Sequence, residues 1–591
     1  MAHDDLILRY YEAEMMYLRE AGKEFAQAHP DRAALLNLDK VSDRDPYVER
    51  LFEGFSFLMG KMRQKLDDDL PELTEGLVSL LWPHYLRTIP SLAVVELTPN
   101  YHKLKEPEIL SKEFEIISQP IGSKKTKCRY RSTRDVELLP LKLSNAQLLH
   151  EPDGRSIIRI RFNCGDLAEW GDIHIHSLPI YLNADSPISS ALHLYLTRYV
   201  QHSFIRYSNA FNSDRRPIDL CFSPMGFDPE DRLWPKGETA FSGYQLLLEY
   251  FSFREKFMFL NLKGLEKIHF PEAIEWFELD IVLNKLWPQD LLFSEENFVL
   301  YCTPVINLFE IEADPLRISG LQHEYLLRPL RIQDGHTEIY SVDHVKSSKR
   351  AEQHDFVPFS SFQHRGGMLR HTAPERYYHT RVRRGASGLY DTWLILGGDA
   401  FEKNFDFEEE ILSLRITATN GQLPRSSLRN SILNQPLHST QLEVKVRNLS
   451  APTMPCYPPS TDRFHWRVLS HLSSNFLSML DNAEILRGTL ALYDWTDDEM
   501  NRRRLEAIIH VEHSLIQRFE KGFLLRGVDI EVTINSNGFS GEGDICLFGE
   551  MLNQFFALYT DIHLFNQLTI TLKPTGKSFR WKENHSQKIS G

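Results

Sequence analysis

The sequence predicts an α+β protein of several domains, and three observations support this. The chain has 591 residues, and at roughly 150 residues per domain this length corresponds to about four domains. Apolar residues recur with helical spacing through about the first 90 residues, and after Pro90 they alternate with the period of a strand. We therefore predict a helical region at 1–90, mixed strand-rich domains at 91–330, a strand-rich arm at 331–460 and a C-terminal α/β domain at 461–591.

The clearest helix is expected over 46–66. Its apolar residues follow one another in steps of one, three or four, which places them within an arc of about 120°. Asp45 can cap the first free amides, and Pro46 suits the first turn. The arc consists of Val48, Leu51, Phe52, Phe55, Leu58, Met59, Met62 and Leu66.

Phe57 breaks this pattern, because it lies opposite the centre of the apolar arc and beside charged positions. A single exposed Phe is common on protein surfaces and needs no explanation. The alternative is that Phe57 belongs to a second contact face against a partner helix. The sequence leaves both interpretations open.

Two more helices are expected in this region, over 7–27 and 71–82. Leucines at helical spacing mark the second, and Pro83 ends it because proline disfavours helix at the preceding residue. The three helices predict an N-terminal bundle. A bundle of this size is marginal alone, so it should dock on the rest of the chain or on another chain.

Strands are expected after Pro90. The stretch Ile157–Phe162 reads Ile-Ile-Arg-Ile-Arg-Phe and has the period of two that a half-buried strand requires. Further strands are predicted over Leu92–Leu97, Glu113–Ile117, Glu278–Leu283, Phe298–Cys302, Ile411–Ala418, Gln441–Val446, Ile530–Ile534 and Thr569–Leu572.

The C-terminal region is expected to return to helix. Helical spacing occurs near 465–480, 482–493, 498–519 and 548–567, while residues 525–541 read as strand and turn. The polar and basic residues from Lys573 onward predict a frayed tail.

Composition excludes several classes of partner. The net charge of -14 makes nucleic acid and anionic membranes poor partners, since both carry negative charge. The six cysteines are scattered and form no Cys-x-x-Cys, which predicts buried thiols in a reducing compartment and no zinc site. The N-terminus does not resemble a signal peptide, and no apolar run approaches 18 residues, so we expect a soluble, cytoplasmic protein.

Two short motifs resemble catalytic or nucleotide-binding elements, and both lack an essential residue. Gly-Phe-Ser-Gly at 538–541 would need a second glycine at 542 to form a nucleophile elbow, and the chain has Glu542. Gly-Lys-Ser at 576–578 would need a glycine at 571 to form a phosphate-binding loop, and the chain has Thr571. A glycine-rich turn is the better interpretation of the first motif.

His174 and His176 alternate with two isoleucines, so on a strand both imidazoles would lie on one face. They could begin a metal site, but no third ligand is near, and an outward polar face is the preferred interpretation. We predict no catalytic, cofactor-binding or metal-binding residues. An enzyme, such as a hydrolase with carboxylates and histidines dispersed in sequence, stays open as an alternative.

Several blocks of the sequence resemble the TssF family of type VI secretion systems, also called VasA or ImpG. The resemblance begins with Tyr10–Ala26 and is most distinctive at Asp45–Leu51 with Glu53–Phe55. The region 331–400 matches less well. The later matching blocks are Lys65–Asp68, Leu81–Arg87, Cys302–Phe309, Thr419–Pro424, Trp466–Leu472, Ser474–Ser478 and Arg526–Gly527.

The resemblance implies a structural wedge protein of the baseplate, similar to the wedge protein of contractile phage tails, with no catalytic residues or cofactors. Two TssF copies are expected to join one TssG, and this subcomplex recruits TssK and the sheath initiator TssE. Six wedges would surround the VgrG spike, start the inner tube and sheath, and dock on the membrane complex at the cytoplasmic face of the inner membrane. A phage tail or an extracellular injection particle is the alternative setting.

On this interpretation the N-terminal helices supply a bundle that is shared with TssF and TssG neighbours, because interfaces of this kind resemble a domain core cut in half. The predicted partner-binding residues all belong to the helix at 46–66. They are Val48, Leu51, Phe52, Phe55, Phe57, Leu58 and Met62.

Overall fold

The computed structural model describes most of the chain after residue 82, and before it only residues 15, 16, 18, 50, 51, 53–59 and 78. The gaps after residue 82 are 152–153, 166, 209–214, 235–241, 269, 272–273, 319–321, 323, 331–335, 348–354, 359–375, 386–387, 398–409, 428–432, 438–442, 460–467, 469–475, 521–522, 560–563 and 586–591.

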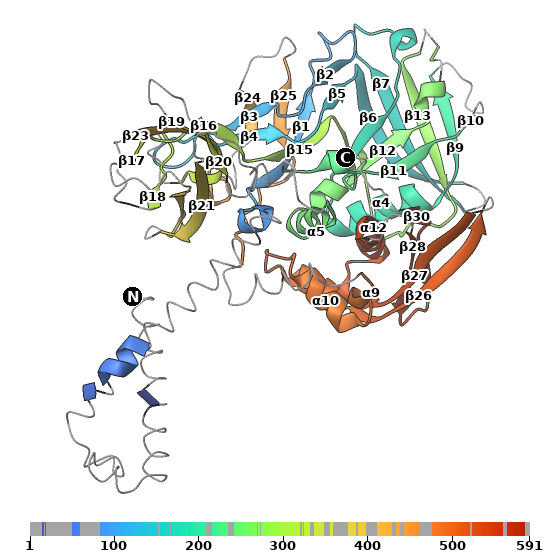
Figure 1. Cartoon of the computed structure of the whole chain (residues 1–591). Coiled ribbons are helices and arrows are strands. Elements are labelled where there is room, and N and C mark those ends of the chain that lie inside the picture. The colour runs from blue at the N-terminus through green and yellow to red at the C-terminus, as the bar shows by residue number, and fades with distance from the viewer. Residues whose placement is uncertain are drawn as a thin grey trace. The chain divides into compact units, whose positions relative to one another are not determined.

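The chain divides into two compact units, residues 1–81 with 462–470 and residues 82–461 with 471–591 (Figure 1). Every described residue of the first unit is helical, as predicted for these positions. A hydrogen bond joins the buried Ser56 hydroxyl to Met15 Sδ at 3.4 Å. The predicted three-helix bundle is not supported, because the packing that defines a bundle falls outside the described residues.

The first sheet of the second unit has the strand order β24-β3-β4-β15-β1-β25. Its strand β1 (Leu92–Thr98) is almost entirely buried, as expected for a continuous apolar run between two neighbours. Strands from both sides of residue 330 share this sheet, and the division into four domains stays a prediction. The other strands are β3 (Glu115–Ser118), β4 (Arg129–Ser132), β15 (Cys302–Ile306), β24 (Leu433–Pro436) and β25 (Lys445–Asn448).

A second sheet has the order β10-β9-β13-β7-β6, and all its pairs are antiparallel. Alternation along β7 turns Ile158, Ile160 and Phe162 inward, where Phe162 stacks on Phe277 at 5.0 Å. The opposite face carries arginines and carboxylates. The strands are β6 (Leu141–His150), β7 (Ser156–Cys164), β9 (Val200–Tyr207), β10 (Arg216–Ile218) and β13 (Trp276–Leu283).

A third sheet, β11-β12-β8-β14, lies beside the helix α4, and the helix α5 packs on α12. Neither helix was predicted. Helix α4 is buried over Ser189–Leu196, so it lacks the one-sided apolar stripe on which sequence recognition depends. The bounds are β8 (Leu178–Leu182), β11 (Cys221–Pro224), β12 (Phe259–Lys263), β14 (Phe298–Leu300), α4 (Ser186–Arg198), α5 (Ser242–Ser252) and, for a separate strand pair, β2 (Glu108–Leu110) and β5 (Val136–Leu138).

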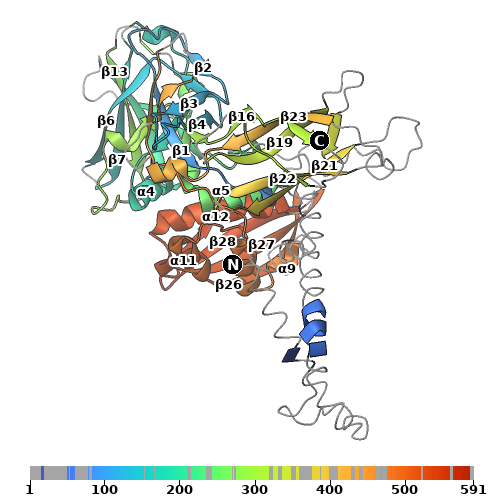
Figure 2. The same cartoon turned by 90° about the vertical axis from the view of Figure 1, so that its left-hand side faces the viewer.

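The strand-rich segment around 309–419 forms a sheet of its own, visible in Figure 2 around β19, β21, β22 and β23. Its order is β16-β23-β19-β20-β21-β22-β18, with β17 also paired to β23. Leu394, Leu412 and Ile416 are fully buried in its core. The strands are β16 (Phe309–Glu312), β17 (Leu316–Ile318), β18 (Glu324–Leu326), β19 (Glu338–Ser347), β20 (Asp355–Pro358), β21 (Tyr377–Arg384), β22 (Tyr390–Gly397) and β23 (Glu410–Thr419).

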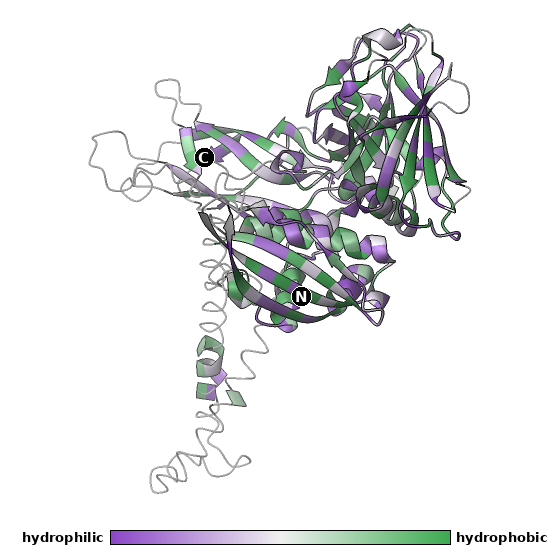
Figure 3. Cartoon of the chain, turned by 90° about the vertical axis from the view of Figure 1, so that its right-hand side faces the viewer, coloured by the Kyte–Doolittle hydropathy of each residue, from purple (hydrophilic) through white to green (hydrophobic). Residues whose placement is uncertain are grey.

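The C-terminal sheet has the order β26-β27-β28-β29, and β30 pairs with β28. Strands β27 and β28 are parallel and are connected through α12, which packs on α4, α5 and β28 (Figure 1). Hydrophobic and hydrophilic residues alternate along these strands (Figure 3). The elements are β26 (Ile508–Glu520), β27 (Phe523–Asn535), α12 (Glu542–Tyr559), β28 (Leu564–Lys573), β29 (Ser578–Arg580) and β30 (Asn584–His585).

Three C-terminal predictions are corrected. The helix expected over 498–519 is a short helix, α11 (Glu499–Glu506), followed by β26, because pairing along β27 overrides local helical spacing. The helix expected over 548–567 is α12, and β28 begins at Leu564. The tail expected from Lys573 forms β29 and β30 and buries Phe579 and Trp581.

The remaining helices are short. No helix among the described residues is long and apolar enough to cross a membrane. These helices are η1 (Pro83–Leu86), η2 (Trp170–Asp172), η3 (Pro229–Asp231), η4 (Arg254–Phe257), η5 (Leu265–Lys267), η6 (Glu295–Asn297), α7 (Leu423–Ser427), α9 (Phe476–Met479), α10 (Ala483–Ala491) and η7 (Ser536–Gly538).

Candidate functional site

The N-terminal helix presents large apolar side chains to solvent. Leu51, Phe55, Phe57 and Leu58 are 70%, 51%, 47% and 61% exposed. Ser56 marks the buried side of the helix, since it is 0% exposed. Isolated exposed apolar residues are ordinary, but several together on one short helix are typical of a surface that binds another protein.

Four of the seven predicted partner-binding residues are therefore exposed in the described chain. The other three, Val48, Phe52 and Met62, lie outside the described residues. The prediction that these residues bind a partner is not tested by the single chain.

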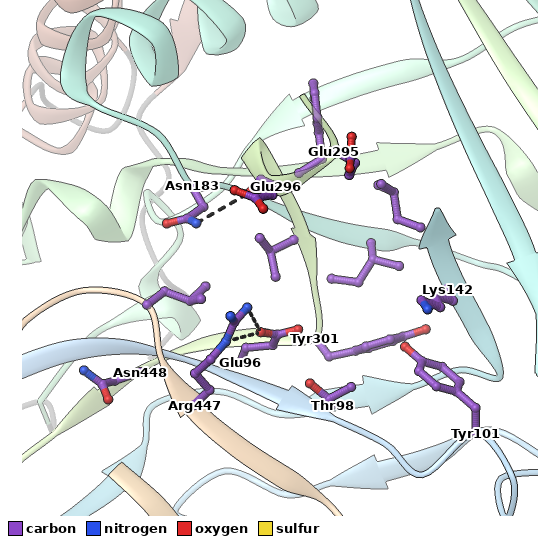
Figure 4. Close-up of a pocket in the computed structure, with 15 residues that line it drawn as sticks. Glu96, Thr98, Tyr101, Lys142, Asn183, Glu295, Glu296, Tyr301, Arg447 and Asn448 are labelled. Carbon is purple, nitrogen blue, oxygen red and sulfur yellow. Dashed lines mark hydrogen bonds and ion pairs between the residues drawn. The ribbon is translucent and has the colours of Figure 1, made fainter. Parts of the chain in front are cut away.

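The second unit contains a polar pocket of about 480 Å³, drawn in Figure 4. Side chains of β1, β6, β25 and η6 line it, so residues far apart in sequence meet there. Both Nε and Nη2 of Arg447 donate to Glu96 Oε2, at 3.0 and 2.6 Å. The labelled polar residues of the lining are Glu96, Thr98, Tyr101, Lys142, Asn183, Glu295, Glu296, Tyr301, Arg447 and Asn448.

Tyr301, which lines this pocket, has an unusual backbone conformation. Its φ of 56° lies in the left-handed region, which is strained for a bulky residue. Its hydroxyl donates to the carbonyl oxygens of Leu139 and Leu141 at 2.8 and 2.6 Å, which holds the side chain in place. Burial raises the pKa of Tyr301 and of Tyr101 well above the usual value, so both phenols stay protonated and neither can act as a base.

The two short motifs serve structural roles. Ser540 lies in the turn before α12, where its backbone N–H donates to Asp544 at 3.1 Å, and Gly541 has a φ of 149°. Lys577 lies in the turn between β28 and β29, where its ammonium pairs with Glu542 at 2.5 Å. The glycine-rich turn predicted at 538–541 is confirmed.

The two histidines considered as metal ligands point outward. His174 and His176 are exposed while Ile173 and Ile175 are buried, although the segment has no strand hydrogen bonding. The outward polar face is confirmed, and the segment is not a strand. No group of three or more His, Cys, Asp or Glu residues suited to a metal occurs in the described part of the chain.

One feature of the site was missed by sequence reasoning. The outer face of the sheet β10-β9-β13-β7-β6 gathers arginines over two buried carboxylates, Glu278 and Asp280. Alternating arginines in β7 and alternating acids in β13 were the available signal. The sequence alone does not show that β7 and β13 pair with each other.

Comparison with known proteins identifies the family. A family model described as "Type VI secretion system, TssF" matches residues 3–588. The chain is 28% identical to the type VI secretion system component TssF1 of Pseudomonas aeruginosa PAO1, over 98% of each chain.

Solved structures give the same result. One chain of a cryo-electron-microscopy structure of the type VI secretion system TssK–TssF–TssG baseplate subcomplex is 58% identical, with a TM-score of 0.82 over 92% of this chain and 100% of that one. A chain of a structure of the baseplate complex from the type VI secretion system is 55% identical, with a TM-score of 0.67 over 99% of this chain and 100% of that one.

The matches span almost the whole sequence, and they agree with the blocks of residues that resemble the family. The chain belongs to the TssF family of type VI secretion systems, whose members are structural components of the baseplate and not enzymes.

Proposed function

We propose that this chain is a wedge component of the type VI secretion baseplate and assembles with TssG and TssK. The observation that carries the proposal is the 58% identity to a chain of the TssK–TssF–TssG subcomplex, over 92% of this chain. At that identity the surfaces that form the complex are expected to be retained along with the fold.

The finer organisation is also part of the proposal. Two copies join one TssG, the sheath initiator TssE binds the same subcomplex, and six wedges surround the VgrG spike beneath the inner tube. The assembled baseplate docks on the membrane complex at the cytoplasmic face of the inner membrane. The resemblance of the blocks at 10–26 and 45–55 to the family supports this arrangement.

The proposed contact with TssG and with the second TssF copy uses the apolar residues of the N-terminal helix. Fully burying a large apolar side chain stabilises an association by about 1.5–3 kcal/mol before the costs of ordering. Leu51, Phe55, Phe57 and Leu58 are 70%, 51%, 47% and 61% exposed in the single chain. Val48, Phe52 and Met62 complete the proposed surface.

Co-purification with TssG and TssK, followed by mass determination, tests the proposal. We expect a stable complex with two copies of this chain for each TssG. Deleting residues 1–90 should abolish it. A chain that stays monomeric beside both subunits would contradict the proposed function, and an intact complex after the deletion would contradict the role of the N-terminal helices.

The role of Phe57 has a sharper test. Phe57→Ala should weaken association with TssG by about 2 kcal/mol or more, which is roughly a 30-fold rise in Kd. Ile109→Ala is the matched control, because Ile109 is 65% exposed and lies outside the proposed surface. Equal affinities for the two variants would show that Phe57 is an ordinary surface aromatic.

A further inference from the structure

Strand β26 forms one edge of the C-terminal sheet (Figure 1). It is 13 residues long, and β27 pairs with only one of its two sides. For residues 511–517 the structure describes no backbone hydrogen bond on the other side. A long edge of this kind presents a row of N–H and C=O groups with which another strand can pair.

Strand β26 lacks several of the usual protections of an edge. Proteins shield edge strands by making them short, by placing lysine or proline on them, or by covering them. The sequence of β26 contains neither lysine nor proline, and its bulge lies at its start, between Ile508 and His510. Other edge strands of the second unit are shorter, since β10, β11 and β24 have three or four residues and each contains a proline.

The helices that contact β26 cover the first part of one face. Helices α10 and α11 pack against the strand, and the ring of His513 donates to the carbonyl oxygen of Leu480 at 3.3 Å. Val511 on this face is 2% exposed. Leu515, which follows on the same face, is 68% exposed, although Val528 directly opposite in β27 is fully buried. The apolar layer therefore reaches the edge of the sheet at Leu515, where solvent meets it.

The opposite face of β26 carries charges of both signs. Glu512 is 69% exposed and pairs with His510 at 2.7 Å. Arg518 is 52% exposed and forms a fork with Glu583, with Nη1 at 2.7 Å from Oε1 and Nη2 at 3.0 Å from Oε2. Glu512 lies three residues before Leu515, and Arg518 lies three residues after it.

These positions are self-complementary in an antiparallel pair. When a second β26 runs antiparallel with Leu515 opposite Leu515, Glu512 of each strand lies opposite Arg518 of the other. Apolar pairs and pairs of opposite charge directly across two strands are stabilising. Arg518 keeps Glu583 as a partner in this arrangement, since a guanidinium has five N–H donors.

The neighbouring registers lack this match. Centring the pair on Ile516 sets Glu512 opposite Glu520, which brings like charges together. Centring it on Ser514 sets Glu512 opposite Ile516 and gives the carboxylate no cation. The apolar and the charged side chains therefore both favour the register centred on Leu515.

We propose that β26 pairs antiparallel with β26 of a second copy of this chain, about a two-fold axis that passes between the two Leu515 side chains. Pairing over residues 510–520 would form about ten backbone hydrogen bonds and join the two C-terminal sheets. Two-fold contacts of this kind are the commonest in homo-oligomers, because the same residues serve both copies. The inference rests on the proposed function, which brings copies of this chain together, and it adds a second surface at which they meet.

A cysteine at the axis tests the register in the full chain. Leu515→Cys places two thiols directly opposite each other, with Cβ atoms about 4.5–5.5 Å apart, so mild oxidation should link the chains into a covalent dimer. Ser514→Cys lies off the axis and should give a much lower yield. Leu292→Cys, at a 78% exposed position in the loop before η6, and the wild type with its exposed Cys221 measure the background. A yield from Leu515→Cys no higher than this background would overturn the inference.

A charge at the axis tests the contact without cross-linking. Leu515→Lys sets two ammonium groups opposite each other, and sedimentation equilibrium should show a Kd for the dimer that is roughly tenfold or more above that of the wild type. Leu292→Lys should leave the Kd unchanged. Matching circular dichroism spectra would establish that both variants fold. A wild type that stays monomeric, or equal Kd values for the two lysine variants, would contradict the proposed contact.

The outcomes separate this inference from the proposed function. A wild type that binds TssG and TssK, together with no cross-link in Leu515→Cys, overturns only the present inference. A chain that dimerises through β26 but binds neither subunit contradicts only the proposed function. Mass spectrometry of the oxidised complex identifies the linked chains, and a link from position 515 to TssG or TssK in place of a second copy would also overturn the inference.

Discussion

Two regions of this protein bury carboxylates, and they use them differently. On the outer face of the sheet around β13, Glu278 and Asp280 lie beneath partly exposed arginines. In the layer between α4, α5 and α12, Asp544 is equally buried but pairs with Arg504, at 3.1 Å and only 3% exposed, and with Arg254. The clearest difference is between Arg161 of the first region, which is 36% exposed, and Arg504 of the second, which is 3% exposed.

The enclosed layer connects segments that are distant in sequence. Arg254 follows α5, Arg504 belongs to α11 and Asp544 begins α12, so one carboxylate joins three elements. Burial alone would raise the pKa of Asp544, but the two arginines and the Ser540 amide hold it below its usual value.

The largest effect is expected at Asp544. Asp544→Asn removes the charge that neutralises two buried arginines, and breaking a buried pair in this way costs about 3–5 kcal/mol. Urea unfolding at pH 7 measures the change, with Asp290→Asn in an exposed loop as control. A loss equal to that of the control would show that the enclosed layer does not depend on this charge.

His193 on α4 gives the enclosed layer a pH dependence. Burial, with a smaller contribution from Arg198, lowers its pKa from 6.5 to about 4, and neither ring nitrogen has a hydrogen-bond partner among the described residues. Between these two values the unfolded chain binds a proton that the folded chain does not. Stability is therefore full above pH 6.5 and falls as the pH drops towards 4, by about 3 kcal/mol in total.

His193→Leu should remove this part of the pH dependence. Unfolding free energies measured at pH 7 and pH 5 should differ less in the variant than in the wild type. His202→Leu, at an exposed position on β9, is the control and should leave the dependence unchanged. An unaltered pH dependence in the His193 variant would mean that other groups produce it.

Gly543 tests how tightly the layer is packed. A Cβ at this position would lie 2.2 Å from the carbonyl oxygen of Ser190 on α4, so Gly543→Ala must separate α12 from α4. Overpacking of this kind costs about 1–3 kcal/mol. Gly488→Ala on α10 has no atom within 4 Å of the added carbon and should be neutral or slightly stabilising. Equal stability of the two variants would contradict close packing.

The smallest change in stability is expected on the outer face. Arg155→Gln removes an ion pair in which the arginine side chain is 41% exposed, and Glu151 keeps its pair with Arg215; such exposed pairs contribute about 1 kcal/mol or less. The same urea experiment should therefore show little change. A loss comparable with that of Asp544→Asn would mean that the two regions do not differ as proposed.

Elements with clear local patterns were predictable from the sequence. Strands β1, β7, β13 and β23 lie within two residues of their predicted limits, because alternating or continuous apolar runs determine them locally. Strand β26 was predicted as helix, because its apolar residues satisfy both periods and only pairing with β27 decides between them.

The site was less predictable than the fold. The apolar arc of the N-terminal helix could be named from its spacing, and its members Leu51, Phe55, Leu58 and Met59 are exposed in the chain. The arginines and carboxylates on the outer face of the sheet β10-β9-β13-β7-β6 could not be predicted as neighbours, because Arg161 and Glu278 are 117 positions apart in sequence. Nothing local indicates that β7 and β13 become neighbours.

The sequence by itself determined the family, the α+β class and the position of most strands, since these depend on local periodicity and on blocks of contiguous residues. Only the tertiary structure decided which charged side chains are buried and which are exposed to solvent. The physical reason is that burial and cross-strand register depend on which distant segments pack together. The electrostatic free energy of a charged side chain in turn depends on its burial and on the charges around it.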